Sequence, residues 1–255
     1  MNYRYYLKSD IGTTHAVNQD SAFAQVKNTA LGKAFIGVVC DGMGGMSDGE
    51  YASGLVSGAF MDWFREFSPC NSDGRMQERL FADWDVLISR CNDELYRLGV
   101  RQHAAMGTTL SALLILDRGY YITQLGDSRV YHRNGGSLAQ LTRDHSYVMD
   151  MVQKGMMTER EAVSSKQRNI LTKCVGCAAD IAADLYSGCV SQGDVFLMST
   201  DGFHSGTGLE AINRIIGADS AVKRSGLKGC ILSAIKERKK NGEKDNITAL
   251  AVQVV

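Results

Sequence analysis

Four aspartates stand in short turn-like motifs spread from one end of the chain to the other: Asn18-Gln19-Asp20, Asp41-Gly42, Asp201-Gly202 and Asp245-Asn246. Three of them, Asp41, Asp201 and Asp245, lie at the edge of an apolar, β-prone run. One such aspartate is also typical of a simple turn, because Asp hydrogen-bonds its own backbone. Carboxylates at strand ends can meet when the strands pair, and a group of acids suits a hard divalent cation such as Mg²⁺ or Mn²⁺. Four together therefore predict a metal site.

The composition excludes several classes of protein. The chain has 255 residues, 44% of them hydrophobic, and its 28 basic side chains balance its 28 acidic ones. This length can bury one large core, so we expect a single domain over residues 1–255. The charge balance does not indicate nucleic-acid binding, the apolar runs are far shorter than the about 20 residues that span a bilayer, and the N-terminus lacks a signal-peptide pattern. We expect a cytoplasmic monomer that binds neither nucleic acid nor membrane.

Seven cysteines are scattered along the chain. Cys174-Val175-Gly176-Cys177 has the spacing of a redox or metal motif, but no second pair accompanies it. A chain of this size does not need disulfides to be stable. Ordinary reduced thiols are therefore the favoured interpretation, with a redox or metal role as the alternative.

Hydrophobic periodicity predicts the elements that must position the aspartates. The expected strands are residues 3–9, 21–26, 34–40, 108–116, 120–125, 129–133, 182–190, 194–198 and 247–255. The expected helices are residues 48–67, 75–98, 209–216 and 221–240, with further helical propensity over 146–167. Groups of strands thus alternate with pairs of helices, which indicates an α+β fold with antiparallel sheets and helices packed outside.

Further motifs extend this pattern over nearly the whole chain: Asp41-Gly42-Met43-Gly44-Gly45, Met106-Gly107-Thr108-Thr109, Gly126-Asp127-Ser128-Arg129, Arg143-Asp144-His145, Arg168-Asn169-Ile170-Leu171-Thr172, Ser199-Thr200-Asp201-Gly202 and Asp245-Asn246-Ile247-Thr248. In this order and spacing they resemble the metal-dependent, type 2C serine/threonine protein phosphatases in their bacterial form. The resemblance implies two antiparallel β-sheets packed as a sandwich and flanked by pairs of antiparallel helices. It also implies two Mn²⁺ or Mg²⁺ ions, with a third, weaker one in bacterial members.

The resemblance assigns roles to the acids position by position. Asp41 matches the residue that bridges the two ions, and the Gly42 carbonyl helps to hold the second. Asp201 and Asp245 match the remaining ligands of the first ion, and Asp20 matches an acid that orients the attacking water. Two ions activate a shared water and clamp the phosphoryl group, so serine and threonine phosphates are hydrolysed without a covalent intermediate.

Other positions concern the third ion and the substrate. Asp127 matches a ligand of the third ion, and residues 146–168 correspond to a flap beside the active site. Family members commonly carry Arg where this chain has His15, which can hydrogen-bond phosphate but lacks the guanidinium fork. His15 is therefore expected to bind the substrate phosphate, with a structural turn residue as the alternative. Gln19 replaces a Glu that supports the second ion in many members.

The general acid and two further histidines must also be assigned. No side-chain general acid is identified, because Met43 and Met46 stand where relatives place histidine. His145 and His204 are both expected to be structural, with a catalytic role as the alternative.

The implied substrates are phosphorylated proteins, made by a bacterial Ser/Thr kinase, and the kinase itself. A catalytically weak, phosphatase-like sensing module is the alternative, kept open by His15. An esterase with Ser128 as nucleophile is disfavoured, because its motif would be expected near the N-terminus.

Overall fold

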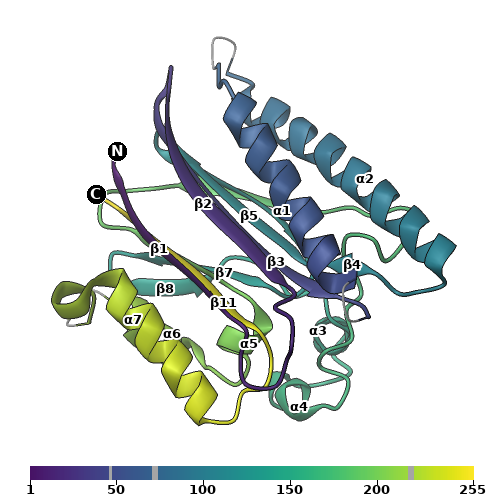
Figure 1. Cartoon of the computed structure of the whole chain (residues 1–255). Coiled ribbons are helices and arrows are strands. Elements are labelled where there is room, and N and C mark those ends of the chain that lie inside the picture. The colour runs from purple at the N-terminus through teal and green to yellow at the C-terminus, as the bar shows by residue number, and fades with distance from the viewer. Residues whose placement is uncertain (46–47, 71–73, 218–220) are drawn as a thin grey trace.

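The chain folds into two antiparallel β-sheets packed face to face, with a pair of helices on the outer side of each (Figure 1). The computed structural model describes residues 1–45, 48–70, 74–217 and 221–255, so Met46 lies outside the described residues. The predicted α+β sandwich is confirmed. None of the described helices is both long enough and apolar enough to cross a membrane.

One sheet contains both the first and the last strand of the chain, which pair with each other. Its strands, in spatial order, are β1 (Tyr3–Asp10), β11 (Ile247–Val254), β10 (Val195–Ser199), β7 (Arg129–Asn134) and β8 (Ser137–Gln140). Helices α6 (Leu209–Ile216) and α7 (Ala221–Lys240) pack on its outer face. The side chains of this interface include Leu197, Ala249, Ile212 and Ile231.

The second sheet carries the longer helix pair. Its strands, in spatial order, are β2 (Asp20–Thr29), β3 (Gly32–Met43), β5 (Leu110–Leu116), β6 (Gly119–Leu125) and β9 (Asp184–Cys189), and the short β4 (Gly107–Thr108) pairs with the end of β3. Helices α1 (Asp48–Glu66) and α2 (Met76–Gln102) cover its outer face.

Strand β3 shows why the run 34–40 is apolar on both faces. Phe35 and Val39 point into the core between the sheets, whereas Ile36 and Val38 pack beneath α1 and α2. Because side chains alternate along a strand, one continuous apolar run serves two cores. This strand therefore contacts both layers of the molecule and carries Asp41 near its end.

Several predicted elements need correction. Helix α2 continues to Gln102 rather than ending at 98, because Gly99 gives room for the Ala104 carbonyl instead of stopping the helix. Helix α7 is interrupted at Gly226, whose φ is +67°. Strand β8 and the four-residue helix α5 (Asp201–His204) were not predicted, because both are too short for a periodic pattern.

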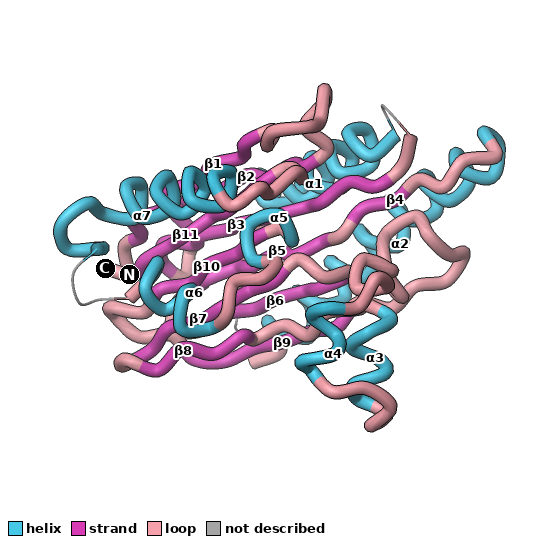
Figure 2. The backbone as a smooth tube through the Cα atoms, turned by 90° about the horizontal axis from the view of Figure 1, so that it is seen from below, coloured by secondary structure: helices cyan, strands magenta, loops and turns pink. Residues whose placement is uncertain are grey.

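The helical segment 146–167 consists of two short helices. These are α3 (Tyr147–Gln153) and α4 (Glu159–Ser164), separated at Gly155, whose φ is +69°. Thr158 begins α4 with a capping box, in which its side chain and that of Glu161 each bond the other's backbone N–H. Figure 2 shows α3 and α4 side by side.

The expectation of reduced thiols is wrong for one pair of cysteines. Cys174 and Cys177 are joined in a disulfide, with their Cα atoms 5.6 Å apart. Gly176 between them adopts φ +93°, a turn that brings the two side chains together. Cys40, Cys91 and Cys189 are free thiols, as expected.

Candidate active site

The predicted acids gather at one end of the sandwich, where strands of both sheets begin or end. Asp20 is the first residue of β2 and pairs directly with Asp41 near the end of β3. Asp245 lies just before β11, Asp201 follows β10 at the start of α5, and Asp127 lies in the turn between β6 and β7. Strand pairing thus unites side chains that are far apart in sequence.

The backbone of Asp41 and Gly42 is held in place by neighbouring loops. The Asp41 N–H donates to Thr109 Oγ1 at 2.9 Å, and the Asp41 carbonyl accepts from the Thr109 N–H and the Thr108 hydroxyl, both at 2.9 Å. A Cβ on Gly42 would lie 1.9 Å from the Gly49 carbonyl oxygen. Only glycine therefore fits beside Asp41.

Asp20 is held by two hydroxyls from the opposite sheet. Its Oδ2 accepts from the Thr200 hydroxyl at 3.0 Å and from the Thr248 hydroxyl at 2.6 Å. Its Oδ1 is buried and has no hydrogen-bond partner in the described part of the chain. Burial raises the pKa of Asp20 to about 7, opposed by the two hydroxyls and reinforced by repulsion from Asp201 and Asp245.

The other carboxylates are perturbed in the same direction. Burial, followed by repulsion from Asp20 and Asp201, raises the pKa of Asp41 well above its ordinary value. Burial and then repulsion from Asp245 raise the pKa of Asp201 to about 6, and its Oδ1 is also buried without a partner among the described residues. The pKa of Asp127 is raised by burial and then by repulsion from Asp201. The surrounding protein therefore does not compensate the negative charge that these carboxyl groups carry when they ionise.

These residues fit a divalent cation. Carboxylate and carbonyl oxygens are the ligands that Mg²⁺ and Mn²⁺ prefer, and a cation would relieve the repulsion that raises these pKa values. Over the described residues, no three His, Cys, Asp or Glu side chains are already arranged around one metal position. The carboxylates thus lie near one another without forming a closed coordination shell.

His15 lies at the open edge of the cluster. Its Nε2 is 3.5 Å from Asp245 Oδ1, and the two side chains are 44% and 45% exposed. The loop that carries His15 is tied to the site by Asn246, whose Nδ2 donates to the Ile11 carbonyl at 2.9 Å and whose Oδ1 accepts from the Gln19 N–H at 2.8 Å. His15 is therefore accessible to a ligand while remaining beside a carboxylate.

Both histidines that were expected to be structural are buried. His145 Nδ1 accepts from the Gly126 N–H at 3.2 Å, so the ring supports the turn that carries Asp127. His204 Nδ1 lies 3.1 Å from the Ser199 hydroxyl, and burial lowers the pKa of His204 well below its ordinary value.

A cavity of about 700 Å³ adjoins the cluster. It is lined by Asp127 and Asp201, by flap residues including Val163 and Arg168, and by the segment that follows α5. The predicted flap segment thus borders the same space as the acids.

Sequence reasoning missed the residues that hold the acids in place. Thr200 and Thr248 lie inside the motifs, yet their bonds to Asp20 span 180 and 228 residues. The same holds for Thr109, whose hydroxyl accepts from the Asp41 N–H. These threonines could have been noticed because each belongs to one of the motifs, such as Gly-Thr-Thr. However, the neighbouring sequence does not indicate which residues they bond.

Comparison with known proteins identifies a matching family. Residues 12–216 match the family described as Protein phosphatase 2C. The chain is 30% identical over 215 residues to the protein phosphatase PhpP of Streptococcus pneumoniae, covering 84% of each protein. It is similar to the solved structure of the S. agalactiae serine/threonine phosphatase, with a TM-score of 0.83, 28% identity and 100% of both chains covered. It is also similar to the catalytic domain of the phosphatase PstP in complex with two manganese ions, with a TM-score of 0.80, 26% identity and coverage of 99% and 98%.

Proposed function

This chain belongs to the protein phosphatase 2C family and is a metal-dependent serine/threonine protein phosphatase, and on that premise we propose that Asp41, Asp201 and Asp245 hold its metal ions. Phosphatases of this family use Mn²⁺ or Mg²⁺. The observation that carries the proposal is the convergence of buried carboxylates whose pKa values are raised by burial and mutual repulsion. The sensing-module alternative is not favoured, since every acid that it would have lost is present.

The proposed ligands divide by position. The carboxylate of Asp41 would be shared by two ions, with the Gly42 carbonyl on the second and Asp201 and Asp245 on the first. Asp127, in the next turn, would serve a third ion. When bound, the ions supply a lowered pKa for the attacking water and charge neutralisation at the phosphoryl oxygens.

Asp20 would orient the attacking water. Its Oδ2 is occupied by the Thr200 and Thr248 hydroxyls, whereas its Oδ1 has no partner among the described residues and can accept a hydrogen bond. Because the two hydroxyls come from β11 and from the residue that follows β10, they hold the carboxylate in one orientation. A fixed acceptor of this kind reduces the entropic cost of placing water for in-line attack.

His15 would bind the substrate phosphate. Its side chain is 44% exposed beside Asp245, at the rim where a phosphoryl group would enter. A ring N–H of His15 can donate to a phosphate oxygen but cannot form the bidentate contact of an arginine.

The substrates are phosphoproteins. We infer further that the chain acts as one phosphatase unit over residues 1–255, as a monomer in the cytoplasm, on the products of a bacterial Ser/Thr kinase and on that kinase. The cavity between the cluster and the flap supports recognition of the protein segment around the phosphorylated residue.

Hydrolysis of p-nitrophenyl phosphate and of a phosphothreonine peptide, with Mn²⁺, Mg²⁺ or EDTA, tests the proposal. Activity should require the metal and fall at least about 10²-fold in Asp201→Asn, since even residues that only support metal ligands typically matter 10–100-fold. Asp85→Asn, on the exposed face of α2, is the matched control and should keep full activity. Activity that survives EDTA, or that is unchanged in Asp201→Asn, would contradict the assignment.

A further inference from the structure

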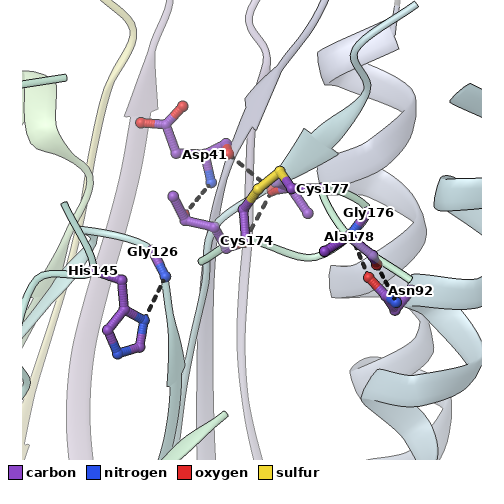
Figure 3. Close-up of a disulfide and its surroundings, with 10 residues drawn as sticks. Asp41, Asn92, Gly126, His145, Cys174, Gly176, Cys177 and Ala178 are labelled. Atoms are coloured by element: carbon purple, nitrogen blue, oxygen red, sulfur yellow. Dashed lines mark hydrogen bonds between the residues drawn. A yellow bond between two sulfur atoms is a disulfide. The ribbon is translucent and has the colours of Figure 1, made fainter. Parts of the chain in front are cut away.

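The disulfide between Cys174 and Cys177 lies against the strand that holds Asp41 (Figure 3). Neither the phosphatase reaction nor the stability of a chain this large requires it, because a bond that closes so short a loop constrains the unfolded chain little. A Cys-x-x-Cys pair is instead typical of reversible thiol–disulfide chemistry. The two cysteines are therefore a candidate modification site.

The two sulfurs differ in access. Cys174 is 2% exposed, whereas Cys177 is an exposed residue. Cys177 also lines a cavity of about 460 Å³ together with Met43 and His103. Thiol–disulfide exchange and oxidation take place at the sulfur that a reagent can reach, so the reaction would begin and end at Cys177.

A short path of hydrogen bonds leads from the disulfide to Asp41. Val175, between the two cysteines, pairs with Thr108 through N–H to carbonyl bonds of 2.9 and 3.0 Å in the two directions. The Thr108 hydroxyl then donates to the Asp41 carbonyl at 2.9 Å, and Thr108 itself pairs with Gly42 across β3 and β4. The loop thus supports the backbone of two proposed metal ligands.

Both sulfurs also pack on the backbone of Gly107. A Cβ added there would lie 2.9 Å from Cys177 Sγ and 3.5 Å from Cys174 Sγ. Gly107 pairs with Met43, two residues after Asp41. The sulfurs cannot move towards β4 without displacing this strand.

Asn92 of α2 holds the other side of the loop. Its Oδ1 accepts from the Gly176 N–H at 2.7 Å, and its Nδ2 donates to the Ala178 carbonyl at 2.9 Å, as Figure 3 shows. Reduction breaks the bond between the sulfurs, which must then move apart to an ordinary non-bonded contact. With Gly107 on one side and Asn92 on the other, this movement would fall on Cys177 and on the Val175–Thr108 pairing.

We propose that Cys174 and Cys177 form a reversible dithiol–disulfide switch, oxidised by a hydroperoxide, whose disulfide form holds Asp41 and Gly42 for tight metal binding. The inference rests on the proposed metal role of these two residues. The Cys177 thiolate attacks the peroxide, the O–O bond breaks, and a sulfenic acid and an alcohol or water result. The Cys174 thiol then displaces water from that sulfur, so two thiols lose two electrons and the peroxide gains them. An external dithiol reverses the reaction by two exchanges.

The test compares Mn²⁺ binding by the whole chain in its two thiol states. Protein is reduced with dithiothreitol or oxidised with stoichiometric hydrogen peroxide, freed of reagent, and examined by alkylation with peptide mass analysis and by calorimetric titration with Mn²⁺. We expect a 174–177 disulfide after oxidation and an Mn²⁺ Kd about fivefold higher in the reduced state, at the low end of typical coupling between sites. Cys177→Ser should show the reduced-state Kd under both treatments. Cys189→Ser, an exposed cysteine on β9, should respond like the wild type.

Three results would overturn the switch. Full alkylation of both cysteines after peroxide means that no disulfide forms, and equal Mn²⁺ affinities in the two verified states mean that the bond does not affect Asp41. An absence of Mn²⁺ binding in both states would remove the proposed metal role itself. The thiol count separates that last failure from a failure of the redox chemistry, since it does not depend on metal.

Discussion

Replacing Asp20 by asparagine is predicted to stabilise the metal-free protein at alkaline pH. In the folded state the buried carboxyl of Asp20 has a pKa of about 7, raised from 3.8 chiefly by burial. The folded protein therefore binds this proton more tightly than the unfolded chain does. As the pH rises from about 4 to about 7, the free energy of unfolding must fall, because ionisation costs more in the folded state.

The magnitude follows from the shift. Relative to low pH, a pKa difference of about 3 units lowers the free energy of unfolding by about 4 kcal/mol at pH 8. At pH 5, where the folded carboxyl is still protonated, it lowers this free energy by about 1.7 kcal/mol. Asparagine removes this cost but places an NH₂ group in a buried site, beside hydroxyls that bonded a carboxylate, which costs about 1–3 kcal/mol. Asp20→Asn should thus gain about 1–3 kcal/mol at pH 8 and be close to neutral at pH 5.

Urea unfolding in EDTA at pH 5, 6.5 and 8 measures the effect. The free energy of unfolding of Asp20→Asn, relative to that of the wild type, should increase by roughly 2.5 kcal/mol from pH 5 to pH 8. Asp85→Asn, exposed on α2, controls for the general effect of removing a negative charge. Saturating Mn²⁺ at 100 times its Kd should then stabilise the wild type by about 2.7 kcal/mol and the variant by less. A difference that stays constant or shrinks as the pH rises would refute the reasoning.

Two further substitutions test the surroundings of the cluster. Gly42→Ala places a Cβ 1.9 Å from the Gly49 carbonyl oxygen, so its free energy of unfolding in urea should fall by more than about 3 kcal/mol. As a control, Gly54→Ala, in open space on α1, should raise the free energy of unfolding by about 0.5–1 kcal/mol. His15→Ala should raise the KM for a phosphopeptide about tenfold, the loss of one charge-assisted hydrogen bond, and leave the melting temperature unchanged because the side chain is 44% exposed. An unchanged KM and kcat would restrict His15 to a structural role.

The fold was predictable because its elements carry strong local signals. The doubly buried strand β3 appears in the sequence as an uninterrupted apolar run, and α1 and α2 show a clear helical period. Asp41, Asp201 and Asp245 were found for the same reason, since each lies at the edge of an apolar run. The wrong predictions concern short elements and one helix end. Strand β8 and helix α5 have only four residues each, and α2 continues past the predicted end because Gly99 packs against a carbonyl.

The contacts that orient the site could not be predicted, because their partners are remote. Nothing near Thr248 indicates that its hydroxyl bonds a carboxylate 228 residues away. The disulfide was missed for a related reason. The spacing of Cys174 and Cys177 permits either state, and only the turn at Gly176 and the clamp from Asn92 bring the sulfurs together.

The cluster shows that stability and metal binding place opposite demands on the same side chains. Two hydroxyls, from Thr200 and Thr248, orient Asp20 but do not neutralise it, and its remaining oxygen has no partner among the described residues. A site built only for stability would pair this carboxyl with a cation of the protein, as Arg129 pairs with Asp144 nearby through bonds of 2.9 and 2.7 Å. The two arrangements lie within one end of the sandwich, so the difference is not a matter of burial alone. The charge that the protein leaves uncompensated is the charge that a divalent ion would neutralise, which is why these acids are better explained by metal binding than by folding.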